Sequence, residues 1–127
     1  PGKHVGGLTT GGLGWTDSGN KAVIGGIARE FYRRVKKHYD ADAAWVHEKR
    51  DGYKFYRKDE DAMWTFEPKV AEKILRDMLD EAKVPVVFGE RLDRAKGVKL
   101  DGKRVVSMTT ESGKTFAGKV FIDATYE

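Results

Sequence analysis

The sequence predicts an α/β fold with two helices, parallel strands and a three-stranded antiparallel β-meander that connects two of those strands. Two amphipathic helical patterns occupy residues 20–39 and 66–83. After them, residues 84–124 have the pattern of a strand, a meander and a second strand. A meander in the place where a crossover helix usually joins two parallel strands is an uncommon arrangement. With 127 residues, the chain has the size of one domain at most.

Residues 1–20 form a loop rich in glycine. Residues 6–20, which we call the glycine loop, hold six of the fifteen glycines of the chain. Such a stretch lets backbone N–H groups approach an anionic or planar ligand closely, and a flexible linker is the alternative interpretation. Gly7 and Gly12 have the outer glycine spacing of a G-x-x-x-x-G-K-[ST] loop, but Leu13 replaces its lysine. The glycine loop is therefore not a generic phosphate loop.

The first helix is predicted over residues 20–39, with Ser18 or Asn20 as its N-cap. Its apolar stripe repeats every four residues and consists of Val23, Ile27, Phe31 and Val35. Gly25 and Gly26 would fall in the first turns, where each costs about 1 kcal/mol relative to alanine. We therefore expect another backbone or a ligand to lie close to the start of this helix.

Residues 40–65 are predicted to be a variable insertion. Residues 45–49 and 53–57 alternate around the turn signal Asp51-Gly52, which indicates a β-hairpin. The charged residues 58–61 are expected to be solvated. Three tryptophans, Trp15, Trp45 and Trp64, are expected to pack in a core, and a substrate pocket lined by them is the alternative.

The second helix is predicted over residues 66–83, because Pro68 suits a first helical position and a continuous apolar face follows it. The segments after it are a buried strand at 84–88, meander segments at 95–100, 103–110 and 114–117, and a buried strand at 119–124. Asp101-Gly102 and Ser112-Gly113 supply the turns of the meander.

Composition excludes several classes of site. The chain has no cysteine, so disulfides and thiolate chemistry are excluded within it. No apolar run reaches transmembrane length. His38 and His47 lack the spacing of metal ligands, and no Ser-His-Asp arrangement is present, so we predict no metal site and name no catalytic residue. The net charge of +4 suits a ligand that carries phosphate.

Four segments of the chain match the sequence pattern of one known protein family. The first is His-Val-Gly-Gly-Leu-Thr-Thr-Gly-Gly-Leu-Gly at residues 4–14, which matches the family pattern His-x-Gly-Gly-x-Thr-Thr-Gly-Gly-Leu-Gly. The others are Gly-Gly-Ile-Ala-Arg-Glu-Phe-Tyr at 25–32, Phe-Glu-Pro-Lys-Val-Ala-Glu at 66–72 and Phe-Ile-Asp-Ala-Thr-Tyr-Glu at 121–127. They follow the order expected of the family and span nearly the whole chain. On these segments, the chain resembles a bacterial family of FAD-dependent oxidoreductases with a glutathione-reductase-like FAD domain.

The resemblance implies a partial Rossmann-like FAD-binding domain. The G-x-G-x-x-G strand-turn-helix of such domains would precede Pro1, so parts of the same protein are expected before and after this chain. The resemblance also implies contacts with FAD. These are Gly6, Gly7 and Leu8 near the pyrophosphate and ribityl chain, Thr9 and Thr10 on the ribityl or flavin edge, Gly11 and Gly12 beside the isoalloxazine ring, and Arg91, Ala124 and Thr125 from the later strands.

The expected function is therefore that of an FAD-dependent oxidoreductase with a small-molecule substrate, of which these residues alone are expected to be inactive. Two alternatives remain open. The cationic first helix and its neighbouring aromatic residues are also typical of a small basic nucleic-acid-binding module. A domain with the flavoprotein fold but without the cofactor is the third interpretation. Under the leading hypothesis we expect no nucleic-acid partner and no membrane span.

Overall fold

The computed structural model describes residues 2–17 and 19–125, which divide into two compact units. The first unit comprises residues 4–86 and contains both helices, and the second contains residues 2–3 and 87–125 of the described chain. All residues of the hydrophobic core belong to the first unit.

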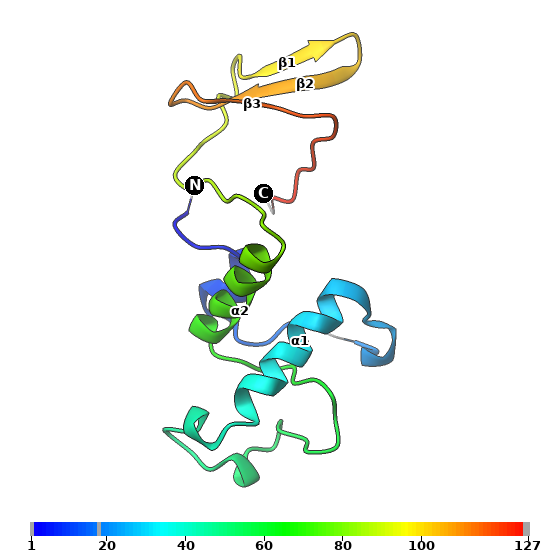
Figure 1. Ribbon diagram of the computed structural model, residues 1–127, viewed down its shortest axis with the longest axis vertical. Coiled ribbons are helices and arrows are strands. Elements are labelled where there is room, and N and C mark those ends of the chain that lie inside the picture. Colours follow the sequence, from blue (N-terminus) through cyan, green and yellow to red (C-terminus); the bar gives the residue numbers. More distant parts are fainter. Residues whose placement is uncertain (1, 18, 126–127) are drawn as a thin grey trace. The chain divides into compact units, whose positions relative to one another are not determined.

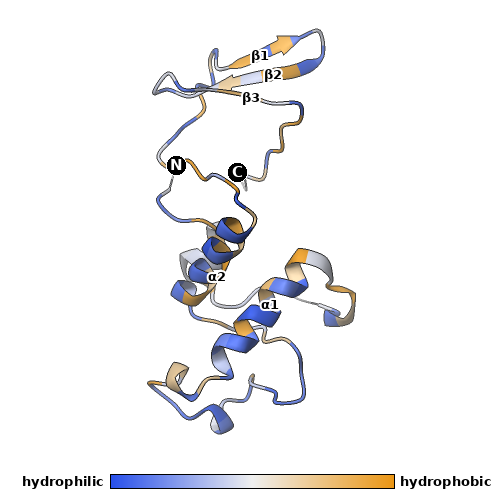
Figure 2. Ribbon diagram, viewed as in Figure 1, coloured by the Kyte–Doolittle hydropathy of each residue, from blue (hydrophilic) through white to orange (hydrophobic). Residues whose placement is uncertain are grey.

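Both predicted helices are confirmed, as α1 (Gly26–Tyr39) and α2 (Pro68–Glu81) (Figure 1). Each shows both polar and apolar turns in the hydropathy colours of Figure 2, as expected of helices with one buried face. Helix α2 begins with Pro68 at its first position, as predicted.

Helix α1 begins later than the sequence pattern predicts. Asn20 acts as a cap, but of a separate 3-10 turn, Lys21–Val23, where its Oδ1 accepts the Ala22 N–H at 3.1 Å. Gly25 is then the N-cap of α1, and Gly26 has a left-handed φ of 54°. Because the chain changes direction there, both glycines stand at the beginning of α1 rather than inside it. The other predicted cap, Ser18, lies outside the described residues.

The core forms where α1 and α2 pack together with the segment 62–66. Its buried members are Phe31, Tyr32, Val35, Tyr39, Ala62, Met63, Trp64, Phe66, Val70, Ala71 and Ile74. The predicted apolar stripe of the first helix is therefore only half buried. Val35 is fully buried, whereas Val23 and Ile27 are 78% and 79% exposed.

The predicted hairpin within residues 40–65 is not formed. The described chain there contains two 3-10 turns, Asp42–Ala44 and Arg50–Gly52, and no strand between them or after them up to residue 57. A hairpin would alternate its side chains between two faces. Instead, Trp45 packs with both Tyr53 and Tyr56, and its indole N–H donates to the Tyr39 carbonyl at 2.8 Å. Aromatic packing against the core thus prevails over the alternating pattern.

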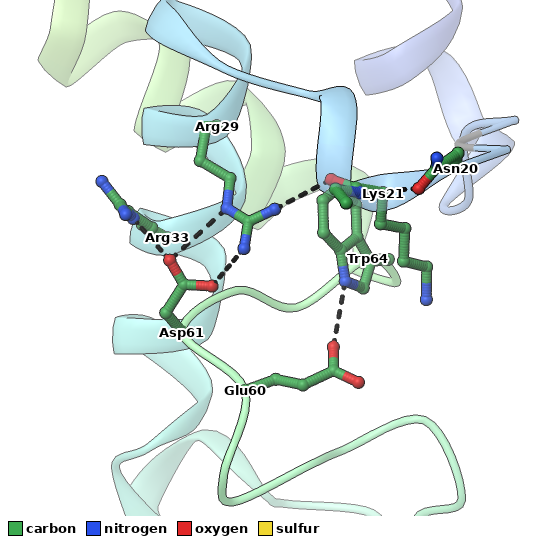
Figure 3. Close-up of polar contacts among 8 residues, drawn as sticks. Asn20, Lys21, Arg29, Arg33, Glu60, Asp61 and Trp64 are labelled. Carbon is green, nitrogen blue, oxygen red and sulfur yellow. Dashed lines mark hydrogen bonds and ion pairs between the residues drawn. The ribbon is translucent and has the colours of Figure 1, made fainter.

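Ion pairs and hydrogen bonds of charged residues connect the segment 60–64 to α1 (Figure 3). Asp61 accepts hydrogen bonds from both Arg29 and Arg33, the latter at 2.7 Å. The same guanidinium of Arg29 lies 5.3 Å from the ring centre of Trp64, whose indole N–H donates to Glu60 at 3.2 Å. The two arginines hold the pKa of Asp61 at about 2. Residues 58–61 are all exposed, as predicted, and Glu60 and Asp61 in addition have structural partners.

The second unit contains the predicted antiparallel meander, with strands β1 (Val98–Asp101), β2 (Arg104–Thr109) and β3 (Thr115–Ala117) in that spatial order. Gly102 makes the first turn with a φ of 60°. Gly97, just before β1, has no room for a side chain, because an added Cβ would lie 2.3 Å from the Thr109 carbonyl oxygen. The meander is confirmed.

The predicted parallel strands are absent from the described residues. Residues 84–88 and 119–124 have no strand pairing there. Except for the half-buried Phe121, their large apolar side chains are exposed, from 38% at Phe88 to 86% at Ile122. A strand becomes regular only when a neighbour accepts its backbone hydrogen bonds, and no described segment does this. The meander therefore does not connect two parallel strands here.

Candidate functional site

The glycine loop has a defined conformation that its glycines make possible. Gly6, Gly7, Gly12 and Gly14 all have positive φ, from 52° at Gly7 to 126° at Gly12. Between them, Thr9–Leu13 forms a π-type helical turn that Gly12 interrupts. Side chains are strained at such φ values, so the composition follows from the shape of the chain. This defined conformation favours a structured loop over a flexible linker.

The start of the glycine loop is packed against α2. A Cβ on Gly6 would lie 2.5 Å from Leu75 Cδ1 and 2.5 Å from Thr10 Cγ2. The buried Thr10 hydroxyl donates to the Val5 carbonyl, within the same turn of chain. His4 Nδ1 lies 2.7 Å from Glu72 Oε2 on α2. These contacts fix the beginning of the loop on the helix and assign Gly6 and Thr10 a packing role.

The end of the glycine loop is joined to the core segment 62–66. The Phe66 N–H donates to the Gly14 carbonyl at 2.9 Å, and Trp15 pairs with Thr65 in an isolated antiparallel bridge. A Cβ on Gly14 would lie 3.0 Å from the Phe66 carbonyl oxygen. The loop is thus held at both ends by the core of the first unit.

The middle of the loop faces open space. A Cβ on Gly11 or Gly12 would meet no heavy atom within 4 Å, in contrast to Gly6. Leu8 and Leu13, on either side, are 61% and 57% exposed. Within the described residues, the hydroxyl of Thr9 has no hydrogen-bond partner. Backbone without side chains, flanked by exposed apolar groups, leaves room for a ligand to approach the middle of the loop.

A cavity of about 460 Å³ lies beside the end of the glycine loop. Leu13, Gly14 and Trp15 form its loop side, and residues 44–48, Tyr53 and Phe55 contribute further wall. We call it the aromatic cavity, because a chain of ring contacts follows its wall. Consecutive ring centres in the series Trp15, Phe55, Tyr53, Trp45 and Tyr39 lie between 4.8 and 5.6 Å apart.

The hydroxyl groups that line the aromatic cavity already have partners. Tyr39 Oη accepts the Glu67 N–H at 2.9 Å, and Tyr53 Oη donates to Thr65 Oγ1 at 3.2 Å. Burial raises the pKa of Tyr39 to about 12, so its phenol stays protonated at neutral pH. At the rim, Lys69 Nζ lies 3.1 Å from Glu67 Oε1. The other ionisable lining residues, His47 and Glu48, are exposed, so the cavity offers aromatic surface more than buried charge.

Trp64 is buried in the core and Trp45 packs against it, as predicted, while Trp15 and Trp45 also line the aromatic cavity. Tyr53 and Phe55 also line the cavity, although the sequence predicts a strand there. Only the proximity of Trp15, far away in sequence, identifies them as cavity residues.

The structure brings Gly6, Gly7, Leu8, Thr9, Thr10, Gly11 and Gly12 together in one loop, whereas the other predicted contacts belong to the second unit. There, Arg91 is exposed and its Nε lies 3.6 Å from Glu111 Oε1. Ala124 and Thr125 are exposed as well. The Thr125 N–H and hydroxyl both donate to Asp123 Oδ1, at 2.9 and 2.7 Å, and these bonds lower the pKa of Asp123. The final pair of the family-like ending, Tyr126 and Glu127, lies outside the described residues.

The part of the chain that the structure describes contains neither a metal-binding cluster nor a membrane-spanning helix. No group of three or more histidine, aspartate and glutamate side chains is arranged to hold a metal ion in residues 2–17 and 19–125. In the same ranges, neither helix has the length and apolar character needed to cross a bilayer.

Comparison with known proteins gives one match. The family model described as FAD dependent oxidoreductase matches residues 1–127, which is the whole chain. No curated protein and no solved structure matches. The chain therefore belongs to the FAD-dependent oxidoreductase family, whose cofactor is FAD.

Proposed function

We propose that this chain forms part of the FAD site of an oxidoreductase that acts on a small molecule, and that its glycine loop lines the flavin. The observation that carries the proposal is the contrast between Gly6 and Gly11. Gly6 is closed off by Leu75 and Thr10, whereas Gly11 and Gly12 face open space on a loop held at both ends. Packing within the chain explains Gly6 and the left-handed φ of 126° explains Gly12, so a ligand that approaches the backbone is needed to explain Gly11.

In this proposal, different residues of the glycine loop contact different parts of FAD. The backbone of Gly6, Gly7 and Leu8 approaches the pyrophosphate and ribityl chain, and the Thr9 hydroxyl hydrogen-bonds the cofactor. Thr10 supports the loop through its bond to Val5 instead. Bound FAD supplies the capacity to accept electrons from the substrate, while the chain binds and orients it.

The second unit is proposed to complete the site. Arg91, Ala124 and Thr125 would contact FAD from the ends of later strands. The exposed apolar segments 84–88 and 119–124 support this, because their side chains suit burial in a sheet. We propose that they pair in parallel with strands of a Rossmann-like domain, including the strand that carries G-x-G-x-x-G.

A nucleic-acid-binding role has less support. Most basic side chains along α1 have acidic partners: Arg29 and Arg33 pair with Asp61, Arg34 with Glu30 and Glu81, and Lys36 with Asp40. Phe31 and Tyr32, two of the aromatic residues that would stack on bases, are buried. Paired cations release few counterions on binding, so the electrostatic basis of that interpretation is weak.

The experiment is a titration of FAD into the full-length protein that carries these residues, followed by flavin absorbance. We compare wild type with Gly11→Leu, whose side chain would enter the open space in front of the loop. Gly52→Leu is the matched control, because Gly52 also has open space and no left-handed φ but lies outside the glycine loop.

The proposal predicts that Gly11→Leu weakens FAD binding by about tenfold or more, which corresponds to roughly 1.4 kcal/mol. Gly52→Leu should bind FAD as wild type does, and both variants should keep the wild-type unfolding midpoint. Equal FAD affinity in the two variants contradicts the placement of the loop. A wild-type protein that binds no FAD supports the cofactor-free alternative.

A further inference from the structure

We propose that the aromatic cavity is the substrate site, and that its ligand is a flat, uncharged aromatic molecule. This inference rests on the proposed function, because it is the flavin beside the glycine loop that makes a neighbouring cavity a substrate site. The cavity itself is defined without the cofactor, by residues of the first unit alone.

The walls of the cavity select for a flat ring. Trp15 and Phe55 meet edge to face, with ring centres 4.8 Å apart and an angle of 64° between their planes. Tyr53 and Phe55 meet in the same manner at 5.6 Å. Aromatic rings inclined in this way present both faces and edges to the space that they enclose, and a further ring can add to the series. A volume of about 460 Å³ lies within the range of small-molecule sites.

The charges around the cavity favour a neutral ligand. Glu67 and Lys69 at its rim pair with each other, and the two tyrosine hydroxyls hydrogen-bond to protein atoms. The other ionisable residues of the wall, His47 and Glu48, are exposed to solvent. A charged ligand would lose water on entering, and an exposed counter-charge such as that of Glu48 is screened by solvent and compensates little. Neutral aromatic surface, by contrast, gains from burial against Trp15, Trp45 and Phe55.

The position of the cavity connects it to the redox centre. Leu13, Gly14 and Trp15 line the cavity, and they follow directly after the open glycines Gly11 and Gly12. The exposed side chain of Leu13 lines the cavity and also lies next to the open glycines. A molecule in the cavity and a flavin over Gly11 and Gly12 would therefore be neighbours along one short stretch of backbone.

Quenching of tryptophan fluorescence tests the inference, because Trp15 and Trp45 line the cavity. The probes are 4-nitrobenzyl alcohol, 4-nitrobenzoate and 4-nitrobenzylammonium, which share a nitroaromatic quencher and differ in charge. They are titrated into the full-length protein with and without FAD, and the visible absorbance of bound flavin is recorded in the same samples.

We expect saturable quenching by the neutral probe, with a half-saturation concentration several-fold lower than that of either charged probe. In FAD-loaded protein, the same titration should change the flavin absorbance band. Phe55→Ala should raise the half-saturation concentration of the neutral probe about tenfold through loss of ring contact and buried area. Ile27→Ala is the matched control, because Ile27 is 79% exposed and is not part of the cavity wall.

Several results would overturn the inference. Quenching that stays linear with probe concentration, or that is unchanged in Phe55→Ala, would show that the cavity does not bind the probe. Tighter binding of a charged probe refutes the ligand class, and saturable quenching without any change of the flavin band refutes the substrate role. If Phe55→Ala does not fold, Phe55→Leu decides instead, since it keeps apolar volume and removes only the ring. Probe binding without FAD binding would refute the proposed function and leave the cavity as a binding site.

Discussion

Replacement of Gly6 by alanine tests whether the glycine loop is built as the contacts indicate. Gly6 has a φ of 95°, where an L-residue pays about 1–2 kcal/mol in backbone strain. The new methyl group would lie 2.5 Å from both Leu75 Cδ1 and Thr10 Cγ2, and such overpacking typically costs about 1–3 kcal/mol. Together, Gly6→Ala should lower the free energy of unfolding by about 2–5 kcal/mol.

The matched control is Gly11→Ala in the same loop. Gly11 has open space around its Cα and no left-handed φ, so alanine there should leave stability unchanged or raise it by up to about 1 kcal/mol. Urea unfolding of the purified protein, followed by tryptophan fluorescence, measures both variants. Equal stability of Gly6→Ala and Gly11→Ala would refute the packing of the loop against α2.

Three further predictions concern the first unit. Val35→Ala should cost about 2 kcal/mol of stability because Val35 is fully buried, whereas Val23→Ala should change stability little because Val23 is 78% exposed. Equal losses of stability in denaturant unfolding would contradict the finding that only half of the apolar stripe is buried. Tyr39→Phe should cost about 1–2 kcal/mol, because the Glu67 N–H loses its acceptor, and an unchanged midpoint would contradict this. Asp61→Asn should lower the melting temperature near neutral pH. Because folding depresses the pKa of Asp61 from 3.8 to about 2, its stabilising contribution is complete above pH 3.8 and disappears as pH falls through about 2, so the difference from wild type should shrink over that interval. A difference that stays constant in melts at several pH values would exclude the ion pairs as its cause.

The sequence predicts local structure well where the determining contacts are local. Helix α2 follows from Pro68 and an apolar face within one stretch of chain. The meander follows from tight turns such as Asp101-Gly102, where Gly102 adopts the positive φ that the turn needs. Both depend on residues a few positions apart, so their patterns are sufficient.

Predictions fail where partners distant in sequence decide the outcome. The start of α1 is set by the turn at Gly25–Gly26 and by exposure of Ile27, which helical periodicity does not reveal. Residues 84–88 have the composition of a buried strand, but a strand also needs a neighbour, and composition does not supply one. Residues 53–57 alternate as a strand does, yet contact with Trp15 and Trp45 directs Tyr53 and Phe55 to the aromatic cavity.

The glycines of one motif have different physical causes, and this distinction has a consequence for interpreting the family pattern. Gly6 and Gly14 are required by the chain itself, since an added Cβ would meet Leu75, Thr10 or the Phe66 carbonyl. Gly11 and Gly12 meet nothing, so packing within the described chain gives no reason for a glycine at Gly11. If a flavin is the reason, substitutions at Gly6 should reduce stability first and cofactor binding only as a result, whereas substitutions at Gly11 should reduce cofactor binding alone. The same motif would then carry two separable signals, one for the fold and one for the ligand.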